Sequence, residues 1–167
     1  MSIKIAPSIL AADFGNLSLE CKKIDNSNAD WFHLDVMDGV FVPNISYGMP
    51  IVKSIRKMTK KPLDVHLMII EPERYIDKFI EIGSDILTVH VEATSKMDNI
   101  IDKINHSGIK SGIAINPDKP KILYNLVPST FPFGKNETII IANKSSPKKV
   151  MYKGNSTNVL NLSLVVI

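Results

Sequence analysis

Cysteine and long apolar runs are what this 167-residue sequence has least of. Its single cysteine, Cys21, excludes an internal disulfide and so indicates a chain that folds in a reducing compartment. The apolar N-terminal segment is interrupted by Lys4 and Pro7, a pattern typical of neither a signal peptide nor a membrane span. We therefore expect a cytoplasmic protein without a membrane partner.

Acidic residues are scarce in the last third of the chain. Residues 121–167 hold six lysines and one acid, Glu137, a net charge of +5; because the whole chain carries +3, residues 1–120 carry −2. The lysines are scattered and no aromatic series accompanies them, so we expect no nucleic-acid partner. The change in composition near residue 120 divides the chain into two parts, 1–120 and 121–167.

Short apolar segments alternate with segments of helical periodicity over the first 120 residues. The pattern predicts strands at 3–10, 31–37, 63–68, 86–91 and 110–115, with helices from about Asp13, Pro50, Pro72 and Met97. Strand starts advance by roughly 26 residues, the pitch of a (β/α)8 barrel, and eight such units need roughly 210 residues. We therefore predict an incomplete α/β barrel of about five βα units, followed by an atypical tail over 121–167 with strand-like runs but no clean connecting helix.

Histidine and aspartate recur at alternate positions of two predicted strands. His33 and Asp35 lie two residues apart and so share one face of their strand, and Asp64 and His66 repeat the pattern. Two such strands side by side would bring His33, Asp35 and His66 together. Two imidazoles and a carboxylate suit a divalent ion such as Zn, Fe, Mn or Co. The alternative is a hydrogen-bonded polar cluster that holds no metal.

A few further residues qualify as candidates. Met37 and Met68 share the faces of the polar residues and either cover a substrate or pack in the core. His90 is either an outer partner of the site or a hydrogen-bonded structural histidine. Cys21 is expected in the core beneath a helix, and Asp38 is expected to shape a turn.

Five ordered motifs carry a resemblance to a known family: Ile5–Leu10 with Ala11–Phe14, His33–Gly39, Phe41–Asn44, Asp64–Met68 and Thr88–Ala93. Over roughly residues 3–120, about 70% of the chain, the sequence resembles the ribulose-phosphate 3-epimerase family. The resemblance implies a ribulose-phosphate-binding TIM barrel and an isomerase of the pentose phosphate pathway. Such an enzyme interconverts D-ribulose 5-phosphate and D-xylulose 5-phosphate by moving one proton at C3.

The resemblance also implies roles for particular residues. One divalent metal ion (Zn, Fe, Mn or Co) would be held by His33, Asp35 and His66, and Asp35 would double as a catalytic acid/base. The substrate, a small sugar phosphate, would be contacted by Ser8, Met37, His66 and Met68. A sibling epimerase for a related ketose phosphate, such as allulose 6-phosphate, would carry the same motifs, and a homo-oligomer is left open.

The tail lacks two features of the family. The family's second catalytic aspartate stands in an Asp-Gly-Gly context on a later strand, but no aspartate follows Asp118. The glycine-rich loops that grip the substrate phosphate are also not found, since the tail offers only isolated Gly134 and Gly154. Because inversion needs a base on each face of the carbon, the alternative expectation is a truncated, catalytically inactive fragment whose tail arose by frameshift, mis-splicing or gene decay.

Overall fold

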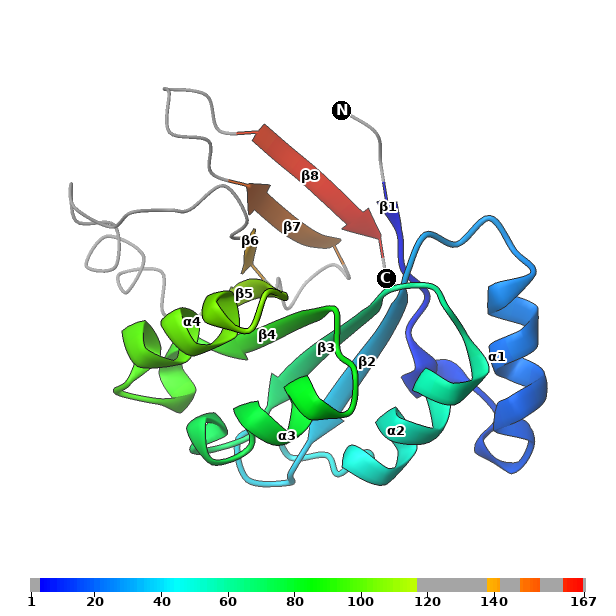
Figure 1. Ribbon diagram of the computed structural model, residues 1–167, viewed down its shortest axis with the longest axis horizontal. Helices are drawn as coiled ribbons and strands as arrows, with labels where there is room; N and C mark the ends of the chain where they lie inside the picture. Colours follow the sequence, from blue (N-terminus) through cyan, green and yellow to red (C-terminus); the bar gives the residue numbers. More distant parts are fainter. Residues whose placement is uncertain (1–3, 117–137, 142–147, 154–160, 167) are drawn as a thin grey trace.

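The computed structural model describes residues 4–116, 138–141, 148–153 and 161–166 (Figure 1). Eight strands form one sheet in the order β1-β8-β7-β6-β5-β4-β3-β2. Their bounds are β1 Lys4–Ile5, β2 Phe32–Met37, β3 Leu63–Met68, β4 Ile86–His90, β5 Lys110–Ile115, β6 Thr138–Ile141, β7 Lys148–Lys153 and β8 Asn161–Val166.

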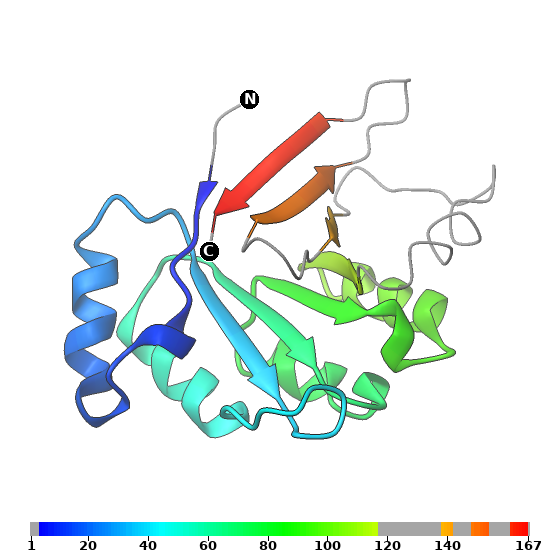
Figure 2. The same ribbon diagram turned by 180° about the vertical axis from the view of Figure 1, so that it is seen from behind.

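The strand order closes on itself. β1 pairs with β8, and a bridge between Ser8 and His33 joins the segment after β1 to β2, with the His33 N–H donating to the Pro7 carbonyl at 3.0 Å. Figure 2 shows β1 between β2 and β8. The segment that follows β1 therefore lies beside β2, although Ser8 and His33 are 25 positions apart in the chain.

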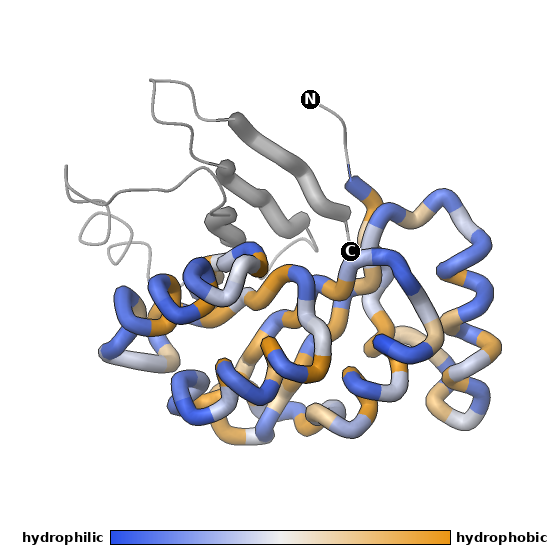
Figure 3. Tube along the Cα trace, viewed as in Figure 1, coloured by the Kyte–Doolittle hydropathy of each residue, from blue (hydrophilic) through white to orange (hydrophobic). Residues whose placement is uncertain are grey.

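Four α-helices accompany the first five strands, and the predicted α/β class is confirmed. They are α1 Leu17–Asp25, α2 Met49–Met58, α3 Ile76–Glu81 and α4 Met97–His106, and they lie outside the strands (Figure 1). The pairs β2–β3, β3–β4 and β4–β5 are parallel, as the helices that connect these strands require, and β5 also pairs in parallel with β6. Hydrophobic and hydrophilic residues alternate along the helices (Figure 3), the pattern expected when one face packs on a sheet.

The described part of the tail departs from this repeat. It contributes three strands, where the sequence indicated one or two, and no helix occurs among its described residues. β7 pairs antiparallel with both β6 and β8. The antiparallel pairs distinguish this part of the sheet from the strand–helix repeat of residues 4–116.

Several predicted boundaries shift by a few residues. The strand expected at 3–10 is limited to Lys4–Ile5, because Ser8 caps a 3-10 turn over Ile9–Ala11. Asp13 likewise caps a 3-10 turn, so α1 begins at Leu17 rather than near Asp13. The strand expected at 86–91 ends at His90, since Val91–Ala93 form a further 3-10 turn, η4.

The strand pattern separates an apolar face from a polar one. Leu34, Val65 and Leu67 are fully buried and belong to one hydrophobic cluster with α2 and α3 residues such as Val52 and Phe79. Cys21 of α1 is buried in the same cluster, as predicted. The alternate positions, His33, Asp35 and His66, are thus left to the other face. Among the described residues, no helix is long and apolar enough to cross a membrane.

One glycine permits a close approach of β4 and β5. Gly112 stands opposite Thr88 in the parallel register. A Cβ atom at Gly112 would lie 2.3 Å from Thr88 Oγ1, and Thr88 is fully buried. The Thr88 side chain of β4 therefore packs directly against the backbone of β5 at Gly112.

Candidate metal centre

Adjacent strands bring the three predicted ligand residues together. β2 and β3 pair so that Asp35 stands opposite His66. Asp35 Oδ1 lies 2.9 Å from His33 Nε2 and 3.0 Å from His66 Nδ1. One ligand atom from each of the three residues lies within 4.8 Å of the other two. The cluster is sequestered, because the side chains of His33, Asp35 and His66 are 0%, 13% and 8% exposed.

The two oxygens of Asp35 have different surroundings. Oδ1 faces both imidazoles, whereas Oδ2 accepts a hydrogen bond from the Ser8 hydroxyl at 3.0 Å. Ser8 is held in place by the 3-10 turn that it caps, since its Oγ accepts the Leu10 N–H. The predicted substrate contact Ser8 therefore lies directly beside the predicted acid/base.

Each histidine uses its second ring nitrogen for another buried partner. His33 Nδ1 lies 2.8 Å from Asp64 Oδ2, and Asp64 is fully buried. His66 Nε2 lies 2.9 Å from His90 Nε2, and the Phe41 ring packs on His90 with a centroid separation of 4.8 Å. His90 is therefore buried in contact with a residue of the cluster, which fits both interpretations of this histidine.

Electrostatics keep Asp35 ionised. Burial opposes the charged form, but hydrogen bonds and the charges of His33 and His66 outweigh it and hold the pKa of the Asp35 carboxyl well below its usual range. Burial and the nearby Asp35 raise the pKa of the Tyr47 hydroxyl. Asp35 is thus a carboxylate at neutral pH, and Tyr47 stays a neutral phenol.

The donor set fits a divalent cation. Two imidazole nitrogens and one carboxylate oxygen converge, and each belongs to a residue whose orientation is fixed by another contact. A neutral imidazole that is hydrogen-bonded through its other nitrogen is the usual form of a metal-binding histidine. His33 fits through Nε2 and His66 through Nδ1, since these are the nitrogens that face Asp35.

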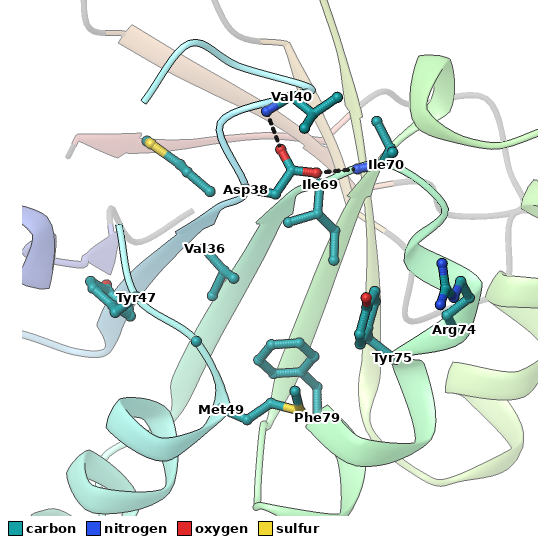
Figure 4. Close-up of a pocket in the computed structure, with 12 residues that line it drawn as sticks. Val36, Asp38, Val40, Tyr47, Met49, Ile69, Ile70, Arg74, Tyr75 and Phe79 are labelled. Carbon is teal, nitrogen blue, oxygen red and sulfur yellow. Dashed lines mark hydrogen bonds between the residues drawn. The ribbon is translucent and has the colours of Figure 1, made fainter. Parts of the chain in front are cut away.

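The two predicted methionines lie at the ends of their strands. Met37 and Met68 are paired across β2 and β3, and both are partly exposed. Met37 also lines a cavity of about 380 Å³ beside the carboxyl ends of these strands (Figure 4). The lining is largely apolar and includes none of the three metal-site residues, so the structure brings Met37 and Met68 near the site without showing that they cover a substrate.

Asp38 connects the two loops that follow β2 and β3, as the turn prediction anticipated in part. Its Oδ1 accepts the N–H groups of Val40 and Phe41, and its Oδ2 accepts the Ile70 N–H at 2.8 Å (Figure 4). Gly39 follows with a φ of 75°, a conformation that favours glycine. The carboxylate of Asp38 is therefore occupied by backbone groups.

Sequence reasoning placed Asp64 on the polar face but gave it no role, and it did not consider Glu92. Glu92 lies on η4, with Oε2 3.4 Å from His90 Nδ1 and Oε1 accepting the Asn116 N–H at 2.6 Å. Burial raises the pKa of Glu92, but the hydrogen bonds from His90 and Asn116 bring it below its ordinary value. The spacing of His90 and Glu92, two residues apart at the end of a strand, repeats that of His33 and Asp35 and was the available signal.

Known proteins resemble this chain over much of its length. The sequence model described as the ribulose-phosphate 3 epimerase family matches residues 4–132. A ribulose-phosphate 3-epimerase of Synechocystis is 51% identical over 121 residues, which cover 71% of this chain and 53% of the relative. That of Bacillus subtilis is 52% identical over 118 residues, 71% of this chain and 54% of the relative. The chloroplastic ribulose-5-phosphate-3-epimerase of Arabidopsis thaliana is 44% identical over 120 residues, 71% of this chain and 43% of the relative. The chain spans about half the length of the curated relatives it matches.

Proposed function

This chain belongs to the ribulose-phosphate 3-epimerase family, and on that basis we propose that it acts on D-ribulose 5-phosphate and D-xylulose 5-phosphate by moving the proton at C3. The observation that carries the proposal is the placement of Asp35, with one carboxylate oxygen between two imidazoles and the other beside Ser8. The family match covers all the residues of this cluster.

His33, Asp35 and His66 would hold one divalent ion, Zn, Fe, Mn or Co. When bound, such an ion supplies a Lewis acid that stabilises negative charge on the oxygen next to C3. Asp35 Oδ1 serves the ion, because it faces the two imidazoles. Asp35 Oδ2 is then the oxygen that takes or delivers the proton on one face of C3, and epimerisation also requires a second acid/base on the opposite face.

Ser8 orients that oxygen, and the Ser8 hydroxyl can contact the substrate while it remains hydrogen-bonded to Asp35. Its hydroxyl donates to Oδ2 at 3.0 Å in the substrate-free arrangement. A hydroxyl both donates and accepts, so the same group can contact a sugar oxygen while it points to Asp35. The low pKa of Asp35 means that the carboxylate is ready to accept a proton before substrate arrives.

The cellular compartment and the partners of the chain are proposed from its cysteine, its family and its charge pattern. Cys21 is a buried free thiol, which suits a reducing cytoplasm. A small sugar phosphate is the proposed partner, and the scattered lysines of the tail give no support to a nucleic-acid partner.

Deuterium exchange tests the proposed function. The full-length chain is incubated in D2O with each pentulose phosphate and with added Zn, Fe, Mn or Co, and proton NMR follows both C3 labelling and formation of the other epimer. We expect labelling and epimerisation, both lost with a chelator, because Asp35 acts beside the metal. The Asp35→Asn variant should lose both activities. Its matched control is Asp77→Asn, the same substitution at an exposed residue of α3.

Each other outcome has a definite meaning. Labelling of one epimer without conversion would contradict epimerisation by this chain and leave Asp35 as a lone base, the alternative raised by the missing Asp-Gly-Gly motif. Faster turnover of allulose 6-phosphate than of either pentulose phosphate would contradict the proposed substrate. No labelling by a metal-loaded chain would contradict the role of Asp35.

A further inference from the structure

A line of buried polar atoms runs from the metal centre to the end of β5. His66 Nε2 lies 2.9 Å from His90 Nε2, and His90 Nδ1 lies 3.4 Å from Glu92 Oε2. Glu92 Oε1 accepts the N–H of Asn116 at 2.6 Å. The side chains of His90 and Glu92 are 7% and 6% exposed, so water does not readily replace these contacts. The line therefore crosses three neighbouring strands, β3, β4 and β5.

The positions of the protons follow from the ends of this line. A carboxylate only accepts hydrogen bonds, so the His90 nitrogen that faces Glu92, Nδ1, must carry a hydrogen. A neutral imidazole has one N–H, which leaves His90 Nε2 as an acceptor. With an ion bound, His66 would give the Nδ1 lone pair to it, and the His66 hydrogen on Nε2 would donate to this acceptor.

We propose that Glu92 is a positioning residue for the metal centre, which acts through His90 to present the Nδ1 lone pair of His66 to the ion. The inference rests on the proposed metal site. An amide at position 92 can donate to His90 Nδ1 as well as accept from it, so His90 in Glu92→Gln could carry its hydrogen on Nε2, and His66 would then place its own hydrogen on Nδ1. That arrangement blocks the ligand atom.

Two observations favour this role over ordinary packing. His90 Nδ1 and Glu92 Oε2 are buried, have no hydrogen-bond partner among the described residues, and face each other at 3.4 Å. The Phe41 ring lies against His90 and restricts rotation of the imidazole. The arrangement also parallels the other side of the cluster, where Asp64 contacts Nδ1 of His33 and leaves Nε2 toward Asp35.

Zinc affinity of the full-length chain tests the proposal. Competition with a chromophoric chelator is used to measure the Zn²⁺ dissociation constant of wild type and Glu92→Gln. We expect Glu92→Gln to bind Zn²⁺ about 10- to 100-fold more weakly, as is typical for loss of an outer partner of a metal-binding histidine. Glu73→Gln is the matched control: Glu73 also has a carboxylate oxygen buried without a hydrogen-bond partner, but it pairs with Lys96. It should bind Zn²⁺ as wild type does.

The tautomers provide a readout that a purely structural role would not move. In the Zn²⁺-loaded chain with ¹⁵N-labelled histidine, we expect the N–H of His66 on Nε2 and that of His90 on Nδ1. An N–H on Nε2 of His90 overturns the proposal, and so does equal Zn²⁺ affinity of Glu92→Gln and wild type. A wild-type chain that binds no Zn²⁺ overturns the proposed metal site as well, whereas normal wild-type binding with an unaffected variant overturns this inference alone.

A second pair of variants decides the matter if Glu92→Gln does not fold. His90→Gln keeps an oxygen that can accept from His66 Nε2, whereas His90→Leu does not. Zn²⁺ affinity should therefore fall in the order wild type, His90→Gln, His90→Leu. Equal affinity of the two His90 variants would overturn the proposal.

Discussion

Replacement of Asp35 by asparagine is expected to abolish Zn²⁺ binding and to slow C3 proton exchange by about 10²- to 10⁴-fold, the usual contribution of a positioned acid/base. The amide lacks the negative charge that lies between His33 and His66, and it cannot take up a proton from carbon. The amide is close to isosteric with the carboxylate, so the fold should persist. The exchange rate and Zn²⁺ affinity are measured beside a circular dichroism melting curve.

Asp77→Asn again serves as the control, because it removes an exposed carboxylate that pairs with Lys103 on the surface. It should leave exchange and metal affinity unchanged. If Asp35→Asn exchanged the C3 proton at the wild-type rate, Asp35 would not be the base of the proposed reaction.

Replacement of Asp64 by alanine is expected to be the most damaging change next to the site. Asp64 is fully buried and contacts His33 Nδ1 at 2.8 Å, so its loss leaves a buried imidazole N–H without this acceptor. An unsatisfied buried donor costs about 1–3 kcal/mol of unfolding free energy. Metal affinity should also fall by about 10- to 100-fold, since His33 would no longer be held with Nε2 toward Asp35.

Asp64→Asn separates the charge from the hydrogen bond. The asparagine oxygen can still accept the His33 N–H, so this variant should retain more stability and more metal affinity than Asp64→Ala. Urea unfolding and chelator competition measure the two quantities. Equal stability and equal affinity of the alanine and asparagine variants would show that Asp64 does not orient His33.

The strands of the site were predictable because their alternation is strong. The predicted segments 31–37 and 63–68 became Phe32–Met37 and Leu63–Met68, and the expected neighbourhood of His33, Asp35 and His66 follows from the pairing of these strands. Glycines also mark two helix ends in the sequence, since Gly83 and Gly108 adopt positive φ two residues after α3 and α4 end. These features depend on a few neighbouring residues.

Contacts that depend on register could not be predicted. Thr88, not His90, stands opposite His66 in the β3–β4 pairing, so the contact between the two histidines depends on side-chain direction as well as sequence spacing. The polar contact of Ser8 with Asp35 required the closure of the sheet between β1 and β2. The antiparallel pairing of β7 was not predicted either, although the tail showed no clean connecting helix and parallel neighbours need a long crossover connection.

The central claim is that His33, Asp35 and His66 form the metal centre, and an anomalous-scattering crystal structure of the Co²⁺-loaded chain tests it most directly. The account predicts one cobalt ion bonded to His33 Nε2, His66 Nδ1 and an Asp35 oxygen, at about the 2.0–2.2 Å usual for such ligands in zinc sites. Cobalt at other residues only, or bound to His66 through Nε2, would contradict it.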